Sequence, residues 1–169
     1  MKFILMLLLS LAATARAQTE FHAYLVTEDL LEGGRVEKMT VASGPYQFAI
    51  RPPKNWSRQV DEAGRKILFK SPTGQSAIQY YFSTNSPGPL PPDDELRPWA
   101  MAAHPGAGVI QTSVCPNSYQ PGIFFDLVRM PSANVIQKFR HAFVAEPQGI
   151  LEVVSVSYTH LTLPTIYSV

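Results

Sequence analysis

The single cysteine, Cys115, is the residue with the most reactive side chain in the sequence. A thiol hydrolase needs a thiolate activated by a nearby imidazole, and an acidic group that orients the ring. His104 and His141 could supply the imidazole, and Asp126 the acid. However, Cys115 precedes a proline and lacks the local sequence that marks a nucleophile elbow. A buried, inert thiol is therefore the alternative interpretation.

A metal site would need histidines and carboxylates at short helical or strand spacing. His22, His104 and His141 are far apart in the sequence, so only tertiary folding could bring them together. We therefore predict no metal site and no cofactor. His141 alternates with Phe139 and Phe143, a pattern typical of a strand histidine that shares its face with aromatic side chains.

Aromatic side chains are the third group with a potential function. Aromatic faces offer a large contact area at low entropic cost, so they often line grooves for carbohydrates or peptides. The residues that we select as candidate ligand-binding residues are Trp56, Tyr80, Tyr81, Trp99 and Tyr119. Filling the hydrophobic core is the alternative role of these side chains.

The segments around these residues have the patterns of short strands. Apolar and polar residues alternate in 46–50 and in 77–83, which is typical of strands with one buried face. Together with a strand at 67–70, they suggest three consecutive antiparallel strands. Further strands are expected at 21–26, 36–41, 110–113, 123–130, 135–145 and 150–154.

One helix is predicted between the two groups of strands. The acidic residues 93–95 would lie at the positive end of its dipole. The residues that fall on one face of it are Leu96, Trp99, Ala100 and Ala103. Pro98 implies a late start or a distorted first turn. This order of elements favours an α+β fold, in which a helix packs on an antiparallel sheet.

The N-terminus has the three-part pattern of a secretory signal peptide. Lys2 supplies the positive charge, residues 3–9 form an apolar run, and small residues end at Ala17. The pattern predicts cleavage after Ala17 and a periplasmic or extracellular protein. A membrane span needs about 20 apolar residues, so no span is expected after cleavage of this shorter run.

The composition restricts the class of partner. The chain has 14 basic and 13 acidic residues, and two of the basic ones, Lys2 and Arg16, precede the predicted cleavage site. The remainder has a net charge of about −1 and no basic stripe, so nucleic acid is not an expected partner. A hydrophobic content of 46% suits one globular domain over residues 18–154.

Residues 155–169 differ in character from the rest of the chain. The run from Val156 to Thr165 is similar to the in-frame translation of a transposase-type sequencing adapter. We therefore expect 155–169 to be a non-native tail on a truncated domain whose C-terminal element is missing. On this interpretation, His160 belongs to no functional site.

Three runs of the sequence carry a resemblance to a known family. Residues 46–56, followed by 67–72 and 78–82, resemble the start of the PsbP and Mog1-like domains. The likeness extends over about 46–154. It implies an α/β/α sandwich with a central antiparallel sheet and a closing C-terminal helix. Members of that group are mostly non-catalytic binding or assembly factors, and no functional residue of the family is matched here.

Two hypotheses about function follow. The first, which we favour, is an exported, non-enzymatic binding or assembly protein whose partner is a protein or a small ligand. The second is a small secreted hydrolase that uses Cys115, or a His/Asp pair such as His141 and Asp126. The second hypothesis requires these side chains to converge in one pocket.

Overall fold

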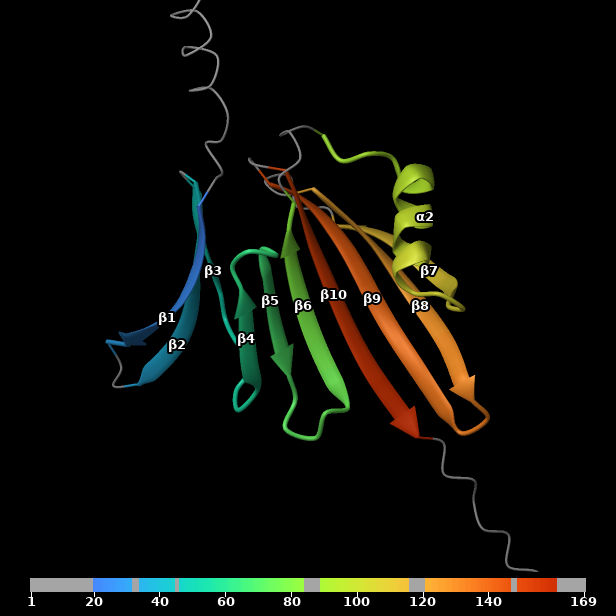
Figure 1. Ribbon diagram of the computed structural model, residues 1–169, viewed down its shortest axis with the longest axis horizontal. Coiled ribbons are helices and arrows are strands. Elements are labelled where there is room, and N and C mark those ends of the chain that lie inside the picture. The colour runs from blue at the N-terminus through green and yellow to red at the C-terminus, as the bar shows by residue number, and fades with distance from the viewer. Residues whose placement is uncertain are drawn as a thin grey trace, which may run out of the picture.

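The computed structural model describes residues 20–31, 34–44, 46–83, 89–115, 121–146 and 149–160, apart from the side chains of Cys115 and His160. These residues form ten strands and one helix, α2 (Asp93–Ala103) (Figure 1). The strands are β1 (Phe21–Asp29), β2 (Arg35–Ser43), β3 (Tyr46–Ile50), β4 (Ser57–Asp61), β5 (Lys66–Lys70), β6 (Ser76–Phe82), β7 (Gly108–Cys115), β8 (Gly122–Ser132), β9 (Val135–Glu146) and β10 (Gly149–His160). The predicted signal peptide and its cleavage site lie outside the described residues, as do residues 161–169.

The expected α+β fold is wrong, and so is the α/β/α sandwich that the resemblance implies. The described residues are mostly β-strand with one short helix, and the strands form two antiparallel sheets. The physical reason lies near the N-terminus, where β1, β2 and β3 form a small sheet of their own. This sheet covers a face of the larger one by packing apolar side chains against it. The protein has a mostly-β fold.

The smaller sheet has the strand order β1-β2-β3. Its pairing is antiparallel, with Phe21 opposite Ser43 and Val41 opposite Phe48. Met39 and Val41 of the central strand are fully buried. One face of this sheet, which carries these apolar residues of β2, therefore packs against the rest of the molecule.

The larger sheet has the strand order β4-β5-β6-β10-β9-β8-β7. Its pairings are antiparallel, and β10 lies between β6 and β9, where Leu151 is opposite both Phe82 and Val144. In Figure 1, the smaller sheet stands beside the β4 end of this sheet, and α2 lies near the β7–β8 end. β10, which includes residues 155–160, is thus a central strand.

Strand β4 was not expected from the sequence. Its five residues are exposed, so they lack the alternation that marks a half-buried strand, yet they pair with β5 from Ser57 opposite Lys70 to Asp61 opposite Lys66. The predicted set of three consecutive antiparallel strands is therefore wrong. β3 pairs with β2 in the smaller sheet, and β5 lies between β4 and β6.

The larger sheet has one face that contacts the smaller sheet, which we call the small-sheet face. Ile67, Phe69 and Phe82 point to it and pack with Phe21 and Met39 in the first hydrophobic core. The rings of Phe21 and Phe82 lie 5.1 Å apart between centroids. Full burial of one such side chain stabilises a fold by about 1.5–3 kcal/mol. This core holds the two sheets together.

The opposite face of the larger sheet, which we call the helix face, carries the second core. Phe125, Leu127 and Phe143 project from β8 and β9 and pack with Leu96 and Ala100 of α2. Leu96 and Ala100 are four residues apart and therefore lie on the same side of the helix. The helix covers the β8–β9 part of this face with these two side chains.

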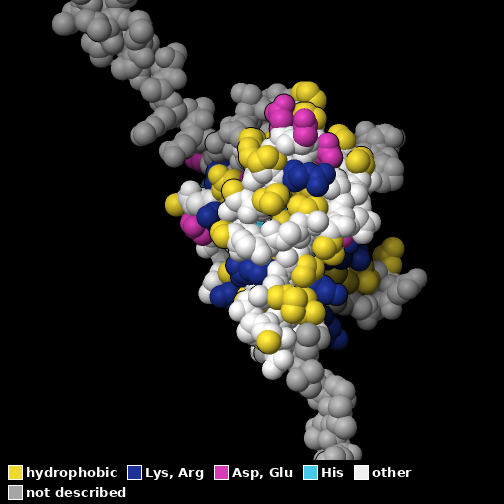
Figure 2. Space-filling model, turned by 90° about the vertical axis from the view of Figure 1, so that its right-hand side faces the viewer, with side chains coloured by type: hydrophobic (Ala, Val, Ile, Leu, Met, Phe, Trp, Pro, Cys, Tyr) yellow, Lys and Arg dark blue, Asp and Glu magenta, His cyan; other side chains and the backbone are white. Residues whose placement is uncertain are grey.

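α2 begins at Asp93 and contains Pro98, so of the two alternatives that Pro98 implied, the late start is wrong. The N–H of Glu95 donates to the carbonyl of Pro92 at 3.1 Å, and the acidic residues 93–95 lie at the positive end of the dipole. Figure 2 shows acidic side chains gathered at one end of this side of the molecule, with basic side chains among hydrophobic ones below them. The helix ends at Ala103, and His104 is its C-cap.

Candidate functional site

A pocket of about 420 Å³ opens between the C-terminal end of α2 and the helix face. Most of the side chains around it are polar or charged. The described residues that line it are Lys66, Gln79, Tyr81, Ala103, His104, His141, Glu152 and Val154. The helix thus supplies one wall of the pocket, and strands β5, β6, β10 and β9 supply the other.

Strand register explains why residues so distant in sequence meet in this pocket. Directly opposed residues of neighbouring strands point to the same face, so each cross-strand row presents its side chains together. The first row consists of Lys66, Tyr81 and Glu152 on β5, β6 and β10. The second row consists of Gln79, Val154 and His141 on β6, β10 and β9. The pocket wall is therefore part of the regular sheet.

His141 is held against Glu152 at the base of the pocket. The two side chains approach to 3.2 Å between Nε2 and Oε2, and the side chain of His141 is only 2% exposed against 28% for Glu152. An ionised carboxylate only accepts hydrogen bonds, so Nε2 of His141 carries the proton and donates it. The hydrogen bond from His141 therefore orients the Glu152 carboxylate, whose side chain remains partly exposed to the pocket.

His104 reaches the same place from the end of α2. Its ring stacks on Phe139 at 4.2 Å between centroids and meets His141 edge-on at 5.4 Å. Burial lowers the pKa of His104 to about 4, with further lowering from His141 and Arg129. Near neutral pH the His104 ring is therefore uncharged.

Two ring nitrogens beside the pocket are buried without a hydrogen-bond partner among the described residues. They are Nε2 of His104 and Nδ1 of His141. Leaving a buried polar group unpaired costs about 1–3 kcal/mol. Such groups are rare in folded proteins.

Lys66 forms the opposite side of the pocket. Its side chain is exposed, and its Nζ lies 5.6 Å from the centre of the Tyr81 ring. This distance suits a cation–π interaction. The first row therefore runs from an ammonium group, over an aromatic ring, to a carboxylate.

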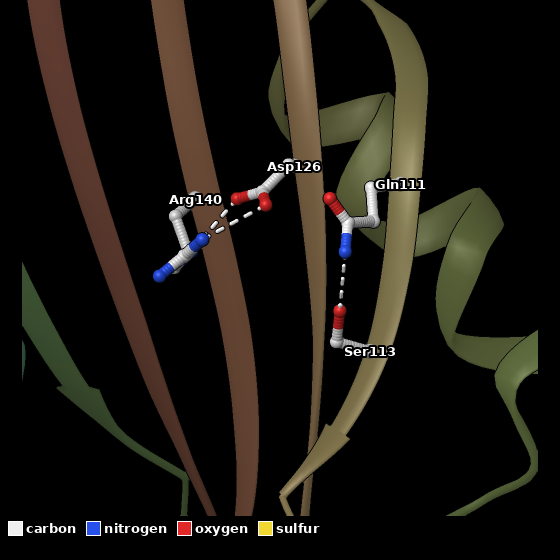
Figure 3. Close-up of polar contacts among 4 residues, drawn as sticks. All are labelled: Gln111, Ser113, Asp126 and Arg140. Atoms are coloured by element: carbon white, nitrogen blue, oxygen red, sulfur yellow. Dashed lines mark hydrogen bonds and ion pairs between the residues drawn. The ribbon is translucent and has the colours of Figure 1, made fainter.

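A second set of polar contacts lies on the small-sheet face, among strands β7, β8 and β9 (Figure 3). Arg140 donates to Asp126 at 2.7 Å from Nε and 2.9 Å from Nη2, while Gln111 donates to Ser113 at 3.2 Å. The hydrogen bonds from Arg140 hold the pKa of Asp126 below its usual value. The same bonds raise the pKa of Arg140.

The structure does not bring Asp126 to His141. Asp126 is opposite Arg140, while His141 is opposite Phe125, so the two side chains point to opposite faces. The carboxylate partner of His141 is Glu152 instead. The backbone of Cys115 pairs with Gly122 at the end of β7, and its side chain lies outside what the structure describes.

The five aromatic residues selected from the sequence do not form one group. Tyr81 lines the pocket, whereas Tyr80 points to the small-sheet face and contacts the first core. Burial raises the pKa of Tyr80. Trp56 is half-buried against the same core, and Trp99 is 49% exposed on α2. Tyr119 lies outside the described residues.

Of the residues that line this pocket, the sequence analysis singled out His104, His141 and Tyr81 but not Glu152, Lys66 and Gln79. The signal for Glu152 was a lone charged residue inside the apolar run 150–154. A charge in such a run points either to solvent or to a buried partner. Nothing in the patterns of β5 and β6 distinguishes Lys66 and Gln79 from ordinary exposed strand residues.

In the described ranges, no group of three or more His, Cys, Asp and Glu side chains is arranged to hold a metal ion. Within the same ranges, no helix has the length and hydrophobicity needed to span a membrane. No protein-family model matches the chain, and no match was found among curated proteins. The resemblance to PsbP and Mog1-like domains therefore stays a prediction.

Proposed function

We propose that this chain is a non-enzymatic binding protein that takes a small polar ligand into the pocket between α2 and the helix face. The observation that carries the proposal is the pocket itself, about 420 Å³ in volume and lined mostly by charged and polar side chains. Small-molecule sites are concave and hold a few well-placed polar groups. The signal-like N-terminus supports a role for the protein after export.

The polar groups of the pocket are positioned before any ligand arrives. Glu152 is held by its hydrogen bond with the buried His141, and the ammonium group of Lys66 contacts the Tyr81 ring. Preorganised groups lose little conformational freedom on binding, so more of the interaction free energy remains as affinity. This arrangement suits recognition of a ligand by its charge and hydrogen-bonding pattern.

The same geometry favours binding over hydrolysis. Among the described residues that line the pocket there is no Ser, Thr or Cys to act as a nucleophile. The second nitrogen of His141 is buried, so it has no access to a substrate in the pocket. A general base must come within hydrogen-bond reach of the proton that it removes. Glu152 and Lys66 are better placed to hold a ligand than to transform one.

The proposal is tested by blocking the pocket. Saturation-transfer NMR is measured with a panel of amino acids, organic acids and sugars on the unmodified protein and on two variants. Ala103→Trp fills the pocket from the helix side, and Ala102→Trp adds the same ring to an exposed neighbour that does not line it. We expect at least one probe to bind with a Kd below about 1 mM, which corresponds to about −4 kcal/mol.

Loss of that signal in Ala103→Trp, with retention in Ala102→Trp, supports the pocket as the binding site. Absence of binding across the panel overturns the proposal, as does binding that survives Ala103→Trp. Thermal unfolding of both variants establishes that the added ring leaves the fold intact.

A further inference from the structure

We infer that the ligand is a zwitterion of the amino-acid class, whose ammonium group binds Glu152 and whose carboxylate binds Lys66. This inference rests on the proposed binding function and specifies its ligand. The observation behind it is the first cross-strand row, in which Lys66, Tyr81 and Glu152 lie side by side on the helix face.

Glu152 is the anionic end of the site. His141 donates to one carboxylate oxygen, Oε2, at 3.2 Å and leaves Oε1 available to a ligand. The Glu152 side chain is 28% exposed and lines the pocket, so a ligand cation can reach its carboxylate from there. A charge-assisted hydrogen bond to an ammonium group is about twice as strong as a neutral one.

Lys66 is the cationic end. Its ammonium group lies over the Tyr81 ring at 5.6 Å and makes no ion pair with a described carboxylate. An ammonium group without an acidic partner can accept a carboxylate as its counter-ion. The ring of Tyr81 between the two ends offers an apolar surface for the carbon chain that joins the charges of the ligand.

The separation of the two ends fits a small molecule. Lys66 and Glu152 lie on strands separated by one strand, so their Cα atoms are about 10 Å apart. Lys66 and Glu152 do not form an ion pair with each other. A molecule with an ammonium group and a carboxylate at its two ends can therefore lie between them across the Tyr81 ring.

The test compares three probes that share one carbon chain. 5-Aminopentanoate carries both charges, pentylamine only the positive one, and pentanoate only the negative one. Isothermal titration calorimetry measures each on the full chain, on Glu152→Gln and on Lys66→Met. Glutamine keeps an acceptor for the His141 N–H, so the substitution removes charge without removing the hydrogen bond.

We expect 5-aminopentanoate to bind at least tenfold tighter than either single-charge probe. Glu152→Gln should weaken 5-aminopentanoate and pentylamine at least tenfold and leave pentanoate within twofold. Lys66→Met should weaken 5-aminopentanoate and pentanoate at least tenfold and leave pentylamine within twofold. The control Lys70→Met, on the same strand and face but away from the pocket, should change none of the three.

Equal affinity for the three probes overturns the inference, and so does equal weakening of all three by either variant. Failure of the inference is distinct from failure of the proposed function. If neither these probes nor the amino acids of the panel bind, while an organic acid or a sugar gives a signal that Ala103→Trp removes, only the assignment to a zwitterion is wrong.

Discussion

The ring of His104, at the end of α2, meets the ring of His141, on β9, at 5.4 Å between centroids with their planes 76° apart. Each ring also stacks on a phenylalanine of β9, His104 on Phe139 and His141 on Phe143. The contact joins the C-terminal end of the helix to the sheet. It also places two uncompensated ring nitrogens inside the molecule, next to the pocket.

Acidification should destabilise the protein through His104. Its pKa is about 4 in the folded state, against 6.5 for a free side chain. Between these values the unfolded chain binds more protons, so the free energy of unfolding rises with pH and falls as pH decreases from about 6.5 to about 4. The largest contribution from this group is about 3 kcal/mol. The titratable groups that face it are His141 and Arg129.

The contribution of His104 is isolated by comparing the pH dependence of urea unfolding in the unmodified protein and in His104→Phe. The variant should lose less stability between pH 6.5 and 4 than the unmodified protein, because phenylalanine binds no proton. His22→Gln, at an exposed histidine, is the matched control for removal of a histidine. Identical slopes for the protein and His104→Phe would contradict the prediction.

Leu96→Ala should lower the free energy of unfolding far more than Trp99→Ala. Leu96 is fully buried in the second core, whereas Trp99 is 49% exposed and touches Phe143 at 6.4 Å between ring centroids. Removing a buried leucine side chain costs about 2–5 kcal/mol, and we expect less than about 1 kcal/mol for Trp99. Chemical denaturation measures the loss in free energy of unfolding of both variants. A larger loss for Trp99→Ala than for Leu96→Ala would show that α2 packs through a different face.

Asp126→Asn should cost about 1 kcal/mol at neutral pH. The bidentate pair with Arg140 is partly shielded, since the side chain of Asp126 is 19% exposed, although that of Arg140 is 58% exposed. Because Arg140 holds the pKa of Asp126 down, the stabilisation is present above the usual value of about 3.9 and disappears as pH falls through the folded-state pKa.

The matched control for this pair is Asp29→Asn. Asp29 and Arg35 form an ion pair at 3.0 Å whose side chains are 79% and 80% exposed. Solvent screens such a pair, so its loss should have almost no effect on unfolding by urea. An equal effect of the two substitutions would mean that the Asp126–Arg140 pair is no stronger than an ordinary surface contact.

Local patterns predicted the strands better than their partners. The alternation in 46–50 correctly gave a strand, but period two does not say which strand lies beside it, and β3 pairs with β2 rather than with β5. β4 was missed because all five of its residues are exposed. The fold class was wrong because the cover for the small-sheet face comes from β1–β3, which no local pattern links to β5 and β6.

In the candidate site, too, local patterns predicted the type of element but not which residues meet. The alternation of His141 with Phe139 and Phe143 predicted a strand histidine among aromatics, and this is confirmed by its stacking on Phe143 at 4.5 Å. Its pairing with Glu152 depends on the β9–β10 register, in which Val154 is opposite His141 and Glu152 lies one diagonal step away. Tyr80 and Tyr81 are neighbours in sequence but point to opposite faces, so selecting both for one groove could not succeed.

The central position of β10 determines the order in which the larger sheet can assemble. β6 ends at Phe82, but its neighbour across the sheet includes Leu151, so the intervening residues must leave the ribosome before the two strands can pair. Until then β6 presents an unpaired edge, and so does β9. Sheets closed by such distant segments fold slowly and expose apolar surface meanwhile. During synthesis, β6 and β9 therefore each keep one unpaired edge until β10 has emerged and inserted between them.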